Sequence, residues 1–258
     1  MGILGKLFGP PDVQKLALKR DVEGLVKILG HEKVGWEAAR ALEELRDSRA
    51  IDPLIAALSD QDSKVRERAA ELLGKMQDPR AIQPLIAALS DEEWLVRSKV
   101  NSALEKLADK AVDPLLAALA NPNSLVREGA ARALGNLSDP RAVEPLIAAL
   151  KDEYDVRKRA AYSLGRLGDR RAVEPLTAFA VGTPNCILVN EVDVAICALL
   201  AIGGPQLEQA LASIKSKVAA DPSLLEQGWT LSYEKHKREA AKYTCDICNT
   251  AQRSLWHL

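Results

Sequence analysis

Cysteine is scarce and unevenly placed in this chain of 258 residues. The four cysteines lie at positions 186, 197, 245 and 248, so none occurs in the first 185 residues. A fold held by disulfide bonds is therefore excluded for most of the chain. A reducing, cytoplasmic setting is the simplest expectation.

Aromatic residues and long apolar runs are also in short supply. Phe, Trp and Tyr make up 4% of the chain, against 47% for all hydrophobic residues, a composition that favours closely packed helices over β-sheets. The longest apolar run, Val194–Ile202, is much shorter than the roughly 20 residues that cross a bilayer. The net charge of −1 gives no overall attraction to nucleic acid or to acidic membranes.

An internal repeat dominates the sequence. A phrase of the type AVEPLIAAL, degenerate in its last copy, occurs five times and starts at Ala50, Ala81, Ala111, Ala142 and Ala172. Its proline falls at positions 53, 84, 114, 145 and 175, so the spacings are 31, 30, 31 and 30 residues. A period of this length predicts stacked pairs of helices.

Two ladders of charged residues keep the same period. The first is formed by Asp47, Asp78, Asp109, Asp139 and Asp169. The second follows a valine in each copy and is formed by Arg66, Arg97, Arg127 and Arg157. Because both ladders repeat with the helices, we expect structural rather than catalytic roles, with ions paired between neighbouring repeats and backbone groups satisfied.

Each period predicts two helices. The first carries its proline in the first turn, where the missing N–H is tolerated. The second follows a polar ladder at positions 60, 91, 121 and 152, in which Asn121 is interpreted as an N-cap and Pro122 as the first helical residue. Glycine inside a helix costs about 1 kcal/mol relative to alanine. We therefore interpret Gly74, Gly135 and Gly165 as points where neighbouring helices approach closely.

The phrase D-x-R-A-V-x-P-L-I-x-A-L, followed by D-x-x-x-V-R-x-x-A-A-x-x-L-G, resembles HEAT-like repeats of the phycobilisome-lyase type. The resemblance covers residues 21–203, with a degenerate first copy at 21–46 and a sixth whose second helix runs from about Val189 to Ile202. It implies an all-α, right-handed α-solenoid of about six helix pairs whose second helices line a concave face. Residues 1–20 precede the repeats as an N-terminal segment. Residues 204–258 are expected to form a helical cap, with helices near 206–220, 222–227 and 233–253.

Positions that vary between the copies mark a surface that is free to bind a partner. On the second helices these positions combine aromatic with basic side chains, as binding hot spots do. The predicted partner-binding residues are Trp36, Arg40, Arg68, Trp94, Lys99, Arg132, Tyr154, Arg159, Tyr162 and Arg166. Trp94 and Tyr154 share one slot and are predicted to flank a basic strip suited to an acidic segment of another protein.

The sequence offers little for a metal or a cofactor, and none is predicted. Cys245 and Cys248 form a lone CxxC and are weak metal candidates, because a zinc site needs two further ligands. His31-Glu32 invites comparison with deoxyhypusine hydroxylase, a HEAT-repeat iron enzyme that needs several His-Glu pairs. The chain has three histidines and one such pair, so we expect it to hold no iron. His31 is expected to have a capping or loop role.

These observations predict a non-catalytic scaffold that binds another protein on its concave face. Two alternatives stay open. One is a bilin-lyase-like accessory enzyme or tetrapyrrole chaperone, although the adjacent His and Cys of those proteins are missing here. The other is a DNA-binding HEAT-like glycosylase, since Trp, Arg and Asp suffice in that family.

Overall fold

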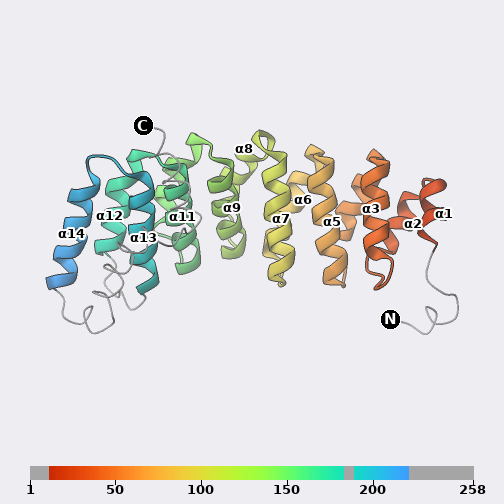
Figure 1. Ribbon diagram of the computed structural model, residues 1–258, viewed down its shortest axis with the longest axis horizontal. Coiled ribbons are helices and arrows are strands. Elements are labelled where there is room, and N and C mark those ends of the chain that lie inside the picture. The colour runs from red at the N-terminus through yellow and green to blue at the C-terminus, as the bar shows by residue number, and fades with distance from the viewer. Residues whose placement is uncertain (1–11, 183–188, 221–258) are drawn as a thin grey trace. The chain divides into compact units, whose positions relative to one another are not determined.

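The computed structural model describes residues 12–182 and 189–220 (Figure 1). Within these ranges all regular secondary structure is helical. No helix in this part of the chain is long and apolar enough to cross a membrane.

Six helix pairs follow one another with the predicted period, in the all-α solenoid class of fold. The pairs are α2 (Val22–Lys27) with α3 (Gly35–Leu45), α4 (Ile51–Ala57) with α5 (Ser63–Met76), α6 (Ile82–Ala87) with α7 (Trp94–Leu107), α8 (Asp109–Ala118) with α9 (Ser124–Leu137), α10 (Val143–Ala149) with α11 (Tyr154–Leu167), and α12 (Val173–Gly182) with α13 (Val189–Ile202). A short helix, α1 (Val13–Leu18), precedes them. The first predicted helix after the repeats is present as α14 (Leu207–Ala220), and the other two fall outside the described residues.

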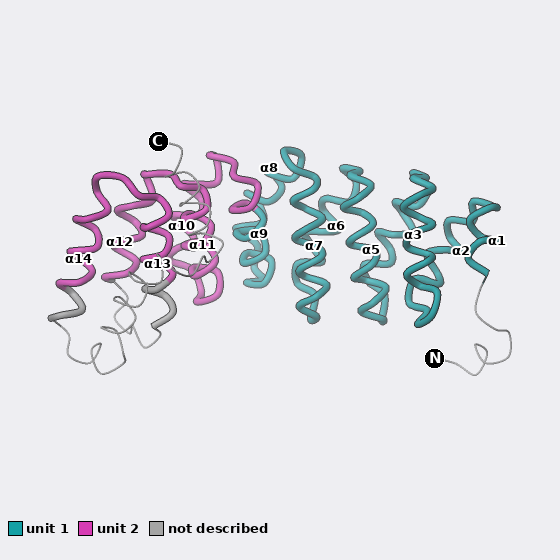
Figure 2. Tube along the Cα trace, in the orientation of Figure 1, with its two compact units in different colours: residues 1–133 teal, residues 134–258 magenta. Residues whose placement is uncertain are grey.

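The chain divides into two compact units, residues 1–133 and 134–258 (Figure 2). The first contains α1 to α8 and most of α9, and the second contains the end of α9 and the helices that follow. Short 3-10 helices lead into the first helix of four pairs: η2 (Ser48–Ala50), η3 (Pro79–Ala81), η5 (Pro140–Ala142) and η6 (Arg170–Ala172). A further one, η4 (Ala88–Ser90), ends the first helix of the third pair.

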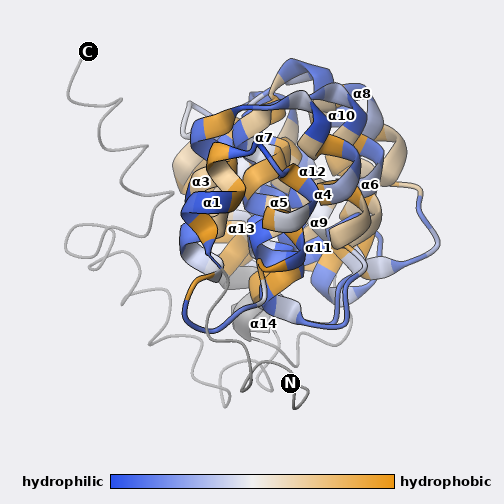
Figure 3. Cartoon of the chain, turned by 90° about the vertical axis from the view of Figure 1, so that its right-hand side faces the viewer, coloured by the Kyte–Doolittle hydropathy of each residue, from blue (hydrophilic) through white to orange (hydrophobic). Residues whose placement is uncertain are grey.

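The repeated apolar residues form the core of each unit. The leucine that follows the repeated proline is fully buried in five copies, as Leu54, Leu85, Leu115, Leu146 and Leu176. Alanine is buried at matching positions of the second helices, where its small side chain lets helices pack closely. Hydrophobic segments accordingly gather where helices face one another, while the connecting turns are mostly hydrophilic (Figure 3).

The predicted N-cap at Asn121 is wrong by two residues. Helix α9 begins at Ser124, and its cap is Asn123, whose Oδ1 accepts the N–H of Leu125 at 2.9 Å. Asn121 instead accepts the N–H of Asn123 at 2.9 Å, which closes a turn just before the helix. Pro122 therefore lies in this turn, because the side chain of Asn121 folds the chain before the helical hydrogen bonds begin.

The prediction of close approach at the three helical glycines is confirmed. A Cβ added at Gly74 would lie 2.6 Å from the Cα of Ala103 on α7. A Cβ at Gly165 would lie 2.7 Å from the Cα of Ala198 on α13, and one at Gly135 would lie 2.9 Å from the Cα of Ser163. At Gly74 and Gly165 the nearest atom is backbone, which moves less readily than the end of a side chain, whereas at Gly135 the side chain of Ser163 is nearer than its backbone.

Gly74→Ala should therefore destabilise the protein by about 1–3 kcal/mol, the usual cost of overpacking, despite the better helix propensity of alanine. Gly129→Ala is the matched control, because a Cβ at Gly129 would meet only the end of the Leu89 side chain. The free energies of unfolding should be compared by urea denaturation. Equal effects of the two substitutions would contradict the role of backbone contact at Gly74.

Candidate functional site

The arginines of the Val-Arg ladder bind the turns that join the helices of a pair. In the first unit each one donates from Nη1 to two carbonyl oxygens, five and six residues earlier in the chain. The contacts are Arg66 to Asp60 and Gln61 (2.8 and 3.1 Å), Arg97 to Asp91 and Glu92 (2.7 and 2.9 Å), and Arg127 to Asn121 and Pro122 (2.8 and 3.0 Å). The arginine side chain thus satisfies carbonyl groups that the helices leave open.

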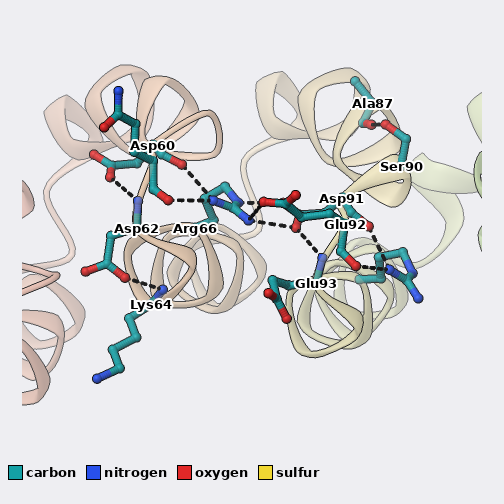
Figure 4. A network of polar contacts seen from close by, with 11 residues as sticks. Asp60, Asp62, Lys64, Arg66, Ala87, Ser90, Asp91, Glu92 and Glu93 are labelled. Atoms are coloured by element: carbon teal, nitrogen blue, oxygen red, sulfur yellow. Dashed lines mark hydrogen bonds and ion pairs between the residues drawn. The ribbon is translucent and has the colours of Figure 1, made fainter.

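Arg66 also links the second pair to the third (Figure 4). Its Nε and Nη2 donate to the carboxylate of Asp91 at 2.6 and 3.0 Å. Both side chains are buried, with 8% and 7% of their surface exposed, and Asp91 raises the pKa of Arg66 above its ordinary value. Breaking such a pair leaves a charge buried without its partner, so Arg66 and Asp91 stabilise the stack rather than offer a site.

The first pair lacks this arginine because Gly35 stands in its place. The carbonyl six residues before Gly35 belongs to Leu29, and it accepts a hydrogen bond from Nη1 of Arg68 on α5. A Cβ at Gly35 would collide with that guanidinium and with the Leu29 carbonyl. Arg68 therefore reaches across from the next pair and does for the first turn what Arg66 does for the second.

The sequence predicts Arg68 on the partner-binding face, because the residue occupies a variable slot. The structure gives the half-buried side chain a contact within the fold, which comparison of the repeats alone does not reveal. The signal was nevertheless present, since the only repeat with glycine at the arginine position precedes the one with Arg68.

Arg68→Ala should lower the free energy of unfolding by about 1–3 kcal/mol, because the buried carbonyl of Leu29 loses its donor. Arg40→Ala serves as the control. Arg40 is exposed and pairs only with Glu44 on its own helix at 2.8 Å, so its loss should change stability by less than about 0.5 kcal/mol. Equal shifts of the urea midpoint for Arg68→Ala and Arg40→Ala would contradict a structural role for Arg68.

Four members of the aspartate ladder cap the 3-10 helices. Asp47, Asp78, Asp139 and Asp169 each accept the N–H of the residue two positions later. That residue is an arginine in every case, and its guanidinium returns to the same carboxylate. Asp109 differs, because it lies within the first turn of α8 and follows Ala108, which has a φ of 48° and a ψ of −130°.

The hydrogen bonds from Arg49, first from its side chain and then from its backbone N–H, lower the pKa of Asp47 from 3.8 to about 2. Arg80, Arg141 and Arg171 lower the pKa values of their aspartates in the same way. All four carboxylates are therefore held in the charged form in the folded protein.

A carboxylate whose pKa is depressed by folding stabilises the folded state above its unfolded pKa, and this contribution is lost as the pH falls through the folded value. For Asp47 that window lies between about pH 4 and pH 2. The stability difference between the parent protein and Asp47→Asn should therefore shrink as the pH falls from about 5 to about 2. Urea denaturation at several pH values measures this, and a constant difference would contradict it.

On the predicted partner face of the first unit, the charged side chains bind one another. Lys75 contacts Glu43 at 2.7 Å and Glu71 at 3.0 Å, and Glu71 also contacts Lys99 at 2.8 Å. These contacts join α3, α5 and α7. Lys99 and then Lys75 lower the pKa of Glu71, whereas Glu43 is the main cause of the raised pKa of Lys75. Much of the basic charge predicted here is thus neutralised within the unit.

Helix α11 of the second unit presents a different surface. Tyr154 lies against Arg157 and Lys158, with 5.8 and 5.7 Å from the cations to the ring centre. Tyr162 lies against Arg159 at 5.8 Å. These are distances at which cations are attracted to aromatic rings. Arg166 is exposed in the last turn of the same helix.

The predicted aromatic residues of the first unit are at the surface. Trp36 is 56% exposed and Trp94 is 64% exposed, while the predicted basic residue Arg132 is half-buried on α9. Trp94 and Tyr154 belong to different units. The strip predicted to run between them therefore stays a prediction.

Two further exposed apolar residues lie in variable slots of the second helices but are not among the predicted partner-binding residues. Leu95 and Leu125 are 45% and 36% exposed, and each is the second residue of its helix, α7 or α9. The internal repeat contained a signal for them, because the same slot holds Lys64 in α5 and Asp155 in α11.

In the described part of the chain, no group of three or more His, Cys, Asp or Glu side chains could hold a metal ion. His31 accepts the N–H of Lys33 at 3.3 Å through Nδ1, in the turn before α3. Cys197 is half-buried on α13, and Cys245 and Cys248 lie outside the described residues.

Comparison with known proteins places these helix pairs in a family. The family model for HEAT repeats matches residues 22–105, 82–164 and 112–193. No curated protein matches the chain.

Several solved structures are similar in fold. The CpcE–CpcF complex of phycocyanin lyase from Nostoc sp. PCC7120 is 24% identical, over 80% of this chain and 87% of that one, with a TM-score of 0.38. Human deoxyhypusine hydroxylase is 19% identical, over 88% and 99% of the chains, with a TM-score of 0.36. Kap95p bound to RanGDP is 12% identical, over 96% and 42%, with a TM-score of 0.49. With the family match spanning most of the six helix pairs, the chain belongs to the HEAT-repeat family.

Proposed function

We propose that the chain is a non-catalytic scaffold that binds an acidic segment of a partner protein through one face of α11. This α11 face consists of Tyr154, Lys158, Arg159, Tyr162 and Arg166. The observation that carries the proposal is the contact of basic side chains with the two tyrosine rings.

The charge of α11 supports an acidic partner. Asp155 is the sole acidic residue of the helix and lies in its first turn, whereas the α11 face carries Lys158, Arg159 and Arg166, so the helix is basic overall. In the first unit, by contrast, glutamates neutralise Lys75 and Lys99. We therefore assign the acidic segment of the partner to α11, where Lys158 and Arg166 are the basic residues that the test below addresses through Arg166.

The tyrosines supply the apolar part of the interaction. Each ring is half-buried, so it is held in place but keeps part of its surface open. Tyrosine beside arginine is common among residues that dominate binding energy, because it adds contact area at a small cost in side-chain entropy. The rings are expected to slow dissociation, and the cations to speed encounter.

Arg166→Glu should weaken binding of a fluorescent, helix-forming peptide of Leu and Glu about tenfold at low salt, since it places like charges together. Lys106→Glu is the matched control, because Lys106 occupies the same slot on α7 and gives the same change in net charge. It should leave the affinity within about twofold, as measured by fluorescence anisotropy.

Tyr154→Ser provides a second arm of the same experiment. The slot holds Ser63 in α5 and Ser124 in α9, so serine is compatible with the fold. The substitution should raise the dissociation rate and leave the association rate nearly unchanged. If Arg166→Glu and Lys106→Glu weaken binding equally, the peptide responds to net charge and the α11 face is not its site.

A further inference from the structure

Three exposed apolar side chains lie at the start of two consecutive second helices in the first unit. Trp94 and Leu95 are the first two residues of α7, and Leu125 is the second residue of α9. Their exposed fractions are 64%, 45% and 36%. We call these three residues the apolar edge.

The fold does not require apolar residues at these positions. Where α7 has Trp94 and Leu95, α5 has Ser63 and Lys64 and forms a helix of the same length. The side chains of the apolar edge are therefore free to serve a purpose other than packing within the pair.

The spacing along the edge matches that of a helix. Helix α9 packs on the third pair, where a Cβ added at Gly129 would touch Leu89. Packed helices lie roughly 8–10 Å apart, and Leu95 and Leu125 hold the same slot on consecutive second helices, so we expect a similar distance between them. Two residues seven apart on one face of an α-helix are separated by about 10.5 Å. A helix laid across α7 and α9 would thus meet both leucines with side chains on its apolar face.

Acidic residues border the apolar edge at Trp94. Glu92 and Glu93 directly precede Trp94, and the side chain of Glu92 is 84% exposed. Asp60 and Asp62 are exposed in the corresponding turn of the second pair, with Lys64 as the exposed basic residue nearby. Arg66 offsets part of this charge, since its Nη2 lies 3.4 Å from Glu92 as well as binding Asp91, but three consecutive carboxylates, Asp91, Glu92 and Glu93, share that one guanidinium.

From the exposed apolar side chains and their acidic surroundings we infer that the apolar edge docks a basic amphipathic helix of a partner protein. The apolar side of that helix covers Trp94, Leu95 and Leu125, and its Lys and Arg side chains lie against Glu92 and Glu93. This site is separate from the α11 face and takes a partner of the opposite charge.

The experiment uses the full chain and two fluorescent peptides with the same helical pattern of leucines, one with lysine and one with glutamate at the polar positions. The double variant Trp94→Ser/Leu95→Lys copies the residues of the second pair. It should bind the Leu/Lys peptide at least tenfold more weakly than the parent chain does. The affinity of this double variant for the Leu/Glu peptide should equal that of the parent chain. Arg166→Glu should have the reverse pattern, so failure of one site is distinguishable from failure of the other.

Two further variants distinguish specific binding at the apolar edge from non-specific hydrophobic binding. Trp36→Ser removes an exposed tryptophan elsewhere in the first unit and should leave Leu/Lys binding within about twofold. Glu92→Gln/Glu93→Gln should weaken it several-fold and reduce its dependence on salt. Equal losses for Trp36→Ser and the edge variant would overturn the proposal. It would also be overturned if the parent chain sediments as a dimer and Trp94→Ser/Leu95→Lys as a monomer, since a second copy would then cover the edge.

Discussion

The fold depends on satisfying the carbonyl groups of the short turns that join the two helices of a pair. Each such turn ends one helix and starts another, so carbonyl oxygens are left without partners in the helical ladder. In the first unit the ladder arginines donate to them from inside the following helix. The first pair shows how strict this requirement is, because Arg68 of the second pair supplies the donor that Gly35 lacks.

The same arginine positions decide how firmly successive pairs are joined. Arg66 reaches a carboxylate, Asp91, that belongs to the next pair. At the next step the residue corresponding to Asp91 is Asn121, which has no charge to offer. The Arg66–Asp91 ion pair therefore cannot recur at the equivalent position of the next step. Close backbone approach at Gly74 and Gly165 brings α5 against α7 and α11 against α13.

Once packing and capping residues are set aside, the two units present different chemistry at equivalent slots. The slot of Trp94 in α7 is filled by Tyr154 in α11, and the slot of Leu95 by Asp155. In the first unit an apolar edge borders acidic turns, whereas in the second a helix carries tyrosines with cations against their rings. A repeat fold permits this, because variable positions change independently while the repeated core keeps every pair in register.

The sequence by itself determined the period, the two helices of each repeat, the buried leucines and the glycines of close approach. It did so because each of these depends on contacts that recur in every copy and so leave a visible pattern. Tertiary structure alone decided which variable residues are available to a partner. Lys99 and Arg68 look equally free in the sequence, yet Lys99 is bound to Glu71 on α5 and Arg68 to the Leu29 carbonyl in the turn of the preceding pair. Leu95 and Leu125 occupy variable slots in the sequence, and the structure adds that both are exposed in the same unit as Trp94. The reason is physical: pairing and exposure of a side chain depend on what the adjacent repeat places beside it, and a single repeat does not contain that information.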